Sequence, residues 1–155
     1  MKNVLMAIVF AVLGSGCDAA RAEPLLIEGG LPDSRWIGSL SYDDSVSARV
    51  DMAYSVLIEN DSMLSEFSTA DYLGRALETF RFGSPGAADW LGSQGETIGT
   101  CTAVGHVLEC ATSVQQMLQV TRTLEFTSLE LRWEETGSSQ STSYERRGVL
   151  HRQSL

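Results

Sequence analysis

The chain contains 155 residues, of which 43% are hydrophobic, and it carries a formal net charge of −9 at neutral pH. This length is enough for one compact domain with a hydrophobic core. An acidic protein repels phosphate backbones, so nucleic-acid binding is disfavoured. Lys2 is the only lysine of the sequence, and it lies in a segment predicted to be removed, which excludes Schiff-base chemistry on a lysine.

Residues 1–22 have the pattern of a secretory signal peptide. Lys2 supplies the positive start, 4–13 is an unbroken run of ten apolar residues, and a small-residue A-x-A site ends at Ala22. The apolar run is too short for a stable transmembrane helix. Cleavage after Ala22 leaves 23–155 as a single globular domain.

A second cleavage site overlaps the first. The residues 13–16 before Cys17 resemble the permissive form of the bacterial lipoprotein box, in which a small residue precedes a cysteine that is lipidated and becomes N-terminal. On this interpretation 1–16 is the signal peptide and Cys17 is the lipidation site. Leu13 lies one position further from the cysteine than in the common form. Asp18 resembles the inner-membrane retention signal of enteric lipoproteins. Both cleavage sites stay open, and both predict export to the periplasm or cell envelope. If Cys17 is modified, the protein is anchored to the membrane by lipid. Otherwise it is a soluble periplasmic or secreted protein.

The first part of the exported domain alternates between apolar and polar residues. Strands are predicted in three segments, with turn signals at 43–44 and 60–62: 36–42, 46–58 and 63–67. The segment 46–58 can also be written as a helix, but that helix would expose Met52 and Val56. A strand is therefore preferred there, and the helix stays open.

A helix is predicted after these strands. Apolar residues recur at helical spacing over 72–80. The stretch 68–71 offers an N-terminal cap with an acid three residues on, and Gly83 is a stop signal. Proline then begins a short helical turn over 85–92. One amphipathic helix is thus expected between the early and the late strands.

Cys101 and Cys110 predict a disulfide-bridged hairpin, since an even number of exported thiols suits a disulfide. Folding 100–111 about a two-residue loop places Gly105 first, where a type II′ turn needs positive φ. Cys101 then faces Cys110 at a non-hydrogen-bonded pair, where Cα atoms approach to about 4.5 Å. The spacing matches no usual zinc pattern, and His106 would point away from the sulfurs, so no metal is expected.

The last third of the chain is predicted to be extended. Alternation over 118–133 shifts phase near 127–128, which indicates a bulge or a corner in one long strand. Arg122 interrupts the apolar stripe and suggests that this face reaches a sheet edge. The polar segment 136–143 is expected to be a flexible loop, and 144–152 a closing strand at an edge, because charges crowd it.

The predicted fold class is α+β. It consists of a mostly antiparallel β-sheet of about six strands with one inserted amphipathic helix packed on it. The alternative is a small β-barrel plugged by that helix.

Catalytic groups are scarce in the sequence. His106 and His151 are the two histidines, and no G-x-S-x-G, H-E-x-x-H or phosphate-binding glycine loop is present. The chain is therefore expected not to be an enzyme and to need no cofactor. Trp36 and Trp90 are candidate partner contacts, because tryptophan is enriched at interface centres. A core position is the commoner place for such a residue.

The sequence thus predicts an exported envelope protein that acts as a binding or assembly accessory module. Its partner would be another exported or envelope protein, with no nucleic acid, and with a membrane contacted only through the lipid on Cys17. Predicted edge strands favour this function, since they can accept a partner strand. The alternative is a carrier of a small apolar ligand in the interior of a β-barrel.

Overall fold

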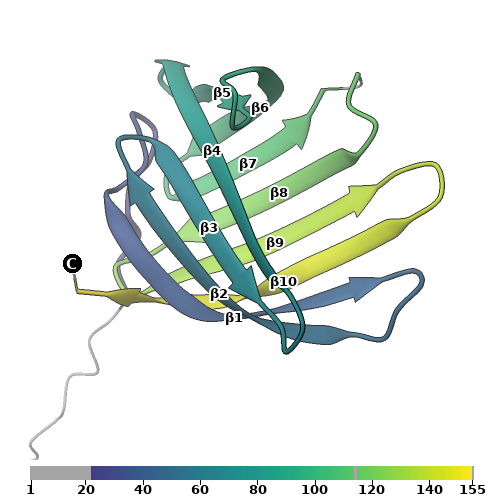
Figure 1. Ribbon diagram of the computed structural model, residues 1–155. Helices are drawn as coiled ribbons and strands as arrows, with labels where there is room; N and C mark the ends of the chain where they lie inside the picture. The colour runs from purple at the N-terminus through teal and green to yellow at the C-terminus, as the bar shows by residue number, and fades with distance from the viewer. Residues whose placement is uncertain (1–21, 114, 155) are drawn as a thin grey trace, which may run out of the picture.

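The computed structural model describes residues 22–113 and 115–154, and these form a closed barrel of antiparallel strands (Figure 1). The strands in chain order are β1 (Ser34–Asp44), β2 (Val50–Glu59), β3 (Ser62–Ser68), β4 (Leu73–Ser84), β5 (Ala87–Leu91), β6 (Thr97–Val104), β7 (Val107–Thr112), β8 (Gln119–Phe126), β9 (Glu130–Ser138) and β10 (Ser143–Gln153). Over the same two ranges the chain has no helix, and hence none long and apolar enough to cross a membrane.

Each strand pairs with its neighbours in the chain, and β1 pairs with β10 to close the sheet (Figure 1). The predicted α+β class with about six strands is therefore wrong. The alternative barrel is correct in its architecture but wrong in its helical plug. Closure removes the sheet edges, because every described strand has a partner on both sides.

The helix predicted over 72–83 is strand β4, and the helical turn predicted over 85–92 contains strand β5. Leu73 and Leu77, which supplied the helical spacing, lie on the outer wall with 78% and 46% of their surface exposed. Gly74 points inward, and a Cβ there would clash with the ring of Phe67. Exposed leucines on the outer face and a glycine on the inner face thus conceal the alternation of apolar and polar residues that marks a strand.

The β6–β7 hairpin confirms the predicted register. Val104 faces Val107, and Cys101 faces Cys110. The two cysteines form a disulfide with a Cα–Cα distance of 4.1 Å. Gly105 has a φ of 59°, as the type II′ turn requires. The segment 46–58, left open between strand and helix, is a strand from Val50 on, since β2 covers Val50–Glu59.

The phase shift near 127–128 is a chain reversal and not a bulge in one strand. Thr127 makes the turn, because its N–H donates to the carbonyl of Glu130 at 2.8 Å and its hydroxyl accepts from the Glu130 N–H at 2.9 Å. The loop predicted over 136–143 is shorter and covers 139–142, since β9 continues to Ser138 and β10 begins at Ser143. β10 pairs with β9 and β1, so it is not an edge strand.

The segment that leads into β1 closes one end of the barrel. Ile27 and Leu31 are buried there. The backbone hydrogen-bonds in succession to the four hairpin turns at that end, through these pairs: Leu25 N–H to Phe126 O, Ile27 N–H to Gly105 O, Gly86 N–H to Glu28 O, and Leu31 N–H to the Asp61 carboxylate. An irregular segment, and not the predicted helix, thus covers this end of the barrel.

Candidate functional site

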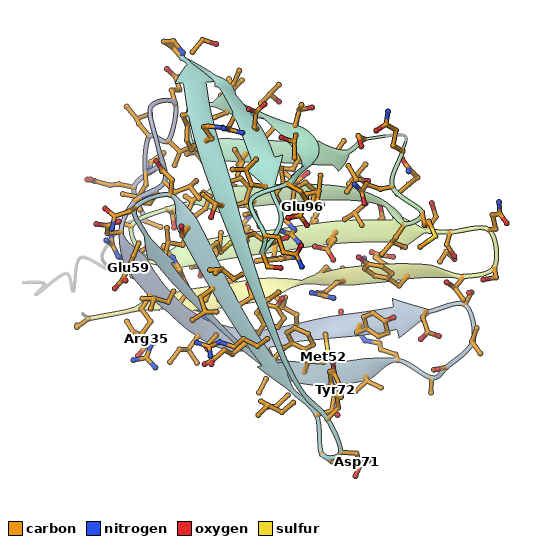
Figure 2. The ribbon with its side chains drawn as sticks, turned by 45° about the horizontal axis from the view of Figure 1, so that its top comes forward. Arg35, Met52, Glu59, Asp71, Tyr72 and Glu96 are labelled. Atoms are coloured by element: carbon orange, nitrogen blue, oxygen red, sulfur yellow. A yellow bond between two sulfur atoms is a disulfide. The ribbon has the colours of Figure 1, made fainter. Side chains whose placement is uncertain are left out.

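The opposite end of the barrel holds a hollow of about 490 Å³. It lies beside the β3–β4 turn, between β1, β2, β3 and β10. The residues that line it are Tyr42, Val50, Met52, Phe67, Thr69, Ala70, Asp71, Tyr72 and Arg146. Figure 2 shows Met52 and Tyr72 near each other and Asp71 at the tip of the turn, whereas Arg35 and Glu59 lie toward the other end.

Most of this lining is apolar or aromatic because alternate residues of the strands point inward. Met52 is 6% exposed and belongs to the inward row of β2. Phe67 stacks on Tyr54, with 5.5 Å between ring centroids, and contacts Tyr72 at 6.0 Å. The aromatic rings therefore support one another and fix the wall of the hollow.

Arg146 is the basic residue of the lining. Its Nη1 donates a hydrogen bond of 2.9 Å to the hydroxyl of Tyr54. The guanidinium carbon lies 5.6–5.8 Å from the ring centroids of Tyr54, Phe67 and Tyr144. Its Nη2 lies 3.8 Å from Oε1 of Glu135. Cation–π contacts and a distant carboxylate thus hold the charge at the wall.

Arg122 is the centre of a buried ionic cluster next to this wall. Its Nε donates to Oε2 of Glu135 at 2.6 Å, and its Nη1 donates to Oε2 of Glu78 at 2.7 Å. The guanidinium lies between the rings of Trp90 and Trp133, at 4.7 and 4.6 Å from their centroids. The sequence expectation that Arg122 marks a sheet edge is wrong: the side chain points into the barrel.

Hydrogen bonds from aromatic residues complete the cluster. The Trp90 indole N–H donates to Oε1 of Glu78 at 3.1 Å, and the Tyr144 hydroxyl donates to Oε1 of Glu135 at 2.8 Å. Both carboxylates therefore have a cation on one oxygen and a neutral donor on the other. Such pairing is what makes burial of ionised groups tolerable.

The cluster fixes the protonation state of its members. Burial alone would raise the pKa of Glu135, but Arg122 and Arg146, with hydrogen bonds from Arg122 and Tyr144, outweigh it and hold the pKa below its usual range. Burial and the Glu135 carboxylate raise the pKa of the Tyr144 phenol. Glu135 is therefore a fixed acceptor and Tyr144 a fixed donor at neutral pH, and neither is poised for proton transfer.

The structure places the sequence-predicted residues as follows. Cys101 and Cys110 form the disulfide on the inner wall, buried with 3% and 4% of their surface exposed. Trp36 and Trp90 are buried inside the barrel, so they are not part of the outer surface that a protein partner would meet. Cys17 lies outside the described residues, and cleavage after Ala22 stays a prediction.

Sequence reasoning missed Arg146 and the Arg122 cluster. Their shared signal is a charged residue at an inward position of an alternating stripe. Arg122 lies between Val120 and Leu124, and Glu135 continues the stripe of Leu131 and Trp133. Arg122 and Glu135 are direct partners across the β8–β9 hairpin. A turn centred between Ser128 and Leu129 would have paired them.

Comparison with known proteins finds no matching family model, no matching curated protein and no matching solved structure.

Proposed function

We propose that this protein binds and carries a small, largely apolar molecule in the hollow at the open end of its barrel. The single observation that carries the proposal is the hollow itself, of about 490 Å³ with mostly apolar and aromatic walls. Pockets that bind small molecules combine such walls with a few polar groups, and their volumes run from about 300 to 1,000 Å³. Here the polar groups come from Arg146 and the β3–β4 turn.

The rest of the barrel supports a site that exists before the ligand arrives. On the wall of the hollow, the Arg146–Tyr54 hydrogen bond ties β10 to β2, and the stack of Phe67 on Tyr54 ties β3 to β2. A cavity whose walls are held in this way loses little conformational entropy on binding. The ligand gains the transfer of its apolar surface out of water.

The accessory function predicted from the sequence remains a second proposal with weaker support. It relied on edge strands that could accept a strand from a partner, and each described strand is already paired on both sides. The candidate partner contacts Trp36 and Trp90 are buried. The predicted signal peptide is compatible with both functions, and it makes the proposed carrier an exported one.

Titration with N-phenyl-1-naphthylamine, an uncharged apolar fluorophore, tests the proposal. We expect enhanced fluorescence with a dissociation constant in the micromolar range, which corresponds to about 8 kcal/mol of binding free energy. Val50→Trp fills part of the hollow and should weaken the binding by about tenfold or more.

Val104→Trp is the matched control, since Val104 lies at the closed end with 72% of its surface exposed, and it should bind as the unchanged protein does. The proposal fails if the fluorophore does not bind, or if Val50→Trp and Val104→Trp bind it equally well.

A further inference from the structure

We propose that the ligand is an uncharged molecule with one carbonyl-type oxygen, to which Arg146 donates a hydrogen bond. The barrel then discriminates against the corresponding carboxylate. This inference rests on the proposed function and adds the chemical class of the ligand. It follows from two observations on the inner wall: donors of Arg146 that lack acceptors, and a charge balance that is already complete.

The donors come first. Nη1 is the one nitrogen of Arg146 that donates a hydrogen bond to another described residue. Nε is buried and has no partner there. Nη2 is 3.8 Å from Glu135, which is beyond hydrogen-bonding distance. A buried donor without an acceptor is costly, and Arg146 lines the hollow with 15% of its side chain exposed. Nε itself is sealed from the hollow, so an acceptor on the ligand would pair with Nη2, whose N–H groups have no hydrogen-bond acceptor among the described residues.

Glu135 cannot supply that acceptor. Its Oε2 accepts from Arg122 at 2.6 Å and its Oε1 accepts from the Tyr144 hydroxyl at 2.8 Å. Moving the carboxylate toward Arg146 would lengthen both bonds. The unused donors of Arg146 therefore face no competing side chain that could take them without breaking the cluster.

The charge balance comes second. Arg122 and Arg146 bring two positive charges, and Glu78 and Glu135 bring two negative charges, so the buried ionic cluster sums to zero. A ligand carboxylate on Arg146 would add a net negative charge a few ångströms from Glu135. Like charges at such distances in a protein interior repel strongly. The acidic chain, with Asp71 on the lining, adds to the repulsion.

An uncharged carbonyl meets both conditions. Its oxygen has two lone pairs and can accept from two N–H groups. It leaves the net charge of the buried ionic cluster at zero, and the alkyl or aryl remainder of the molecule fits the apolar wall. Ketones, esters and amides with one apolar tail belong to this class, and free fatty acids in their ionised form do not.

The test uses three molecules with the same tail as competitors of N-phenyl-1-naphthylamine: 2-undecanone, decanoate and decane, at about pH 8, where a carboxyl group is fully ionised. The ketone replaces the carboxylate O⁻ with a methyl group of similar size. We expect 2-undecanone to bind about tenfold or more tightly than decanoate, and more tightly than decane.

Arg146→Met removes the hydrogen-bond donors. It should weaken the binding of 2-undecanone by about tenfold while the affinity for decane is unchanged. Arg147→Met is the matched control, because Arg147 is the next residue of β10 and points outward with 61% of its side chain exposed. It should change none of the three affinities. The comparison on the unchanged protein stands even if Arg146→Met does not fold.

The outcomes separate the two proposals. If the fluorophore binds and decanoate equals or exceeds 2-undecanone, the ligand class is wrong and the carrier function stands. If 2-undecanone binds no better than decane, Arg146 does not donate a hydrogen bond to the ligand. If neither the fluorophore nor any of the three competitors binds, both proposals fail.

Discussion

Replacing Arg122 with methionine is expected to lower the free energy of unfolding by about 3–5 kcal/mol, the usual cost of breaking a buried ion pair. The side chain is 7% exposed and bonds to two carboxylates, Glu78 and Glu135. Methionine fills similar space between Trp90 and Trp133, so the loss comes mainly from buried carboxylates left without a cation. Chemical denaturation followed by tryptophan fluorescence measures it.

Arg132→Met is the matched control, since Arg132 lies on β9 with 59% of its side chain exposed and only long ion pairs. It should change the stability by no more than about 0.5 kcal/mol. Equal stabilities of the two variants would show that the Arg122 cluster does not hold the barrel together.

The pH dependence of this difference identifies its cause. The pKa of Glu135 in the folded protein lies below its ordinary value of 4.5. Its stabilisation is therefore fully present above that value and is lost as the pH falls through the folded pKa. The stability gap between Arg122→Met and the unchanged protein should be largest above about pH 4.5 and should narrow below it. A gap that does not vary with pH would point to packing alone.

Replacing Ile27 with alanine is expected to lower the free energy of unfolding by about 2–5 kcal/mol. Ile27 has no exposed surface, and its backbone N–H donates to the carbonyl of Gly105 at 2.9 Å. The substitution removes apolar contacts at the closed end and leaves a cavity among the hairpin turns. Thermal or denaturant unfolding measures the loss.

Leu26→Ala is the neighbouring control, because Leu26 is 79% exposed, and it should stay within about 0.5 kcal/mol of the unchanged protein. If Ile27→Ala is as stable as Leu26→Ala, the lead-in segment is not an integral part of the barrel. Ile27→Ala protein that is folded should still bind the fluorophore, since the hollow lies at the other end.

The β6–β7 hairpin was predictable because independent constraints agree on one register. Gly105 can adopt positive φ, the flanking residues alternate, and Cys101 and Cys110 fall opposite each other. All of these are local in sequence. A turn and its flanking strands can be read without knowing the rest of the fold.

Strand β4 was not predictable in the same way. Its inward residues include Gly74 and Glu78, and its outward residues include Leu73 and Leu77, which is nearly the reverse of the usual pattern. Gly74 makes room for the ring of Phe67, and Glu78 meets Arg122. Both causes are tertiary contacts, and tertiary contacts override local periodicity.

The candidate site depends on the same long-range contacts. Arg122 was visible as an interruption of a stripe, but its partner Glu78 is 44 residues away. Arg146 and Tyr54 are 92 residues apart and meet only because β10 and β2 flank β1 in the closed sheet. Barrel closure is a global property, and the residues that line the hollow become neighbours through it.

Methyl NMR of the protein labelled at methionine tests the central claim most directly, because three methionines report on three places. Met52 lines the hollow, Met63 is fully buried in β3 beside the β2–β3 turn, and Met117 is 94% exposed. On titration with 2-undecanone, the Met52 signal should shift in a saturable way while those of Met63 and Met117 stay in place. Saturable binding without a shift of Met52, or with the main shift at Met117, would contradict a ligand site in the barrel.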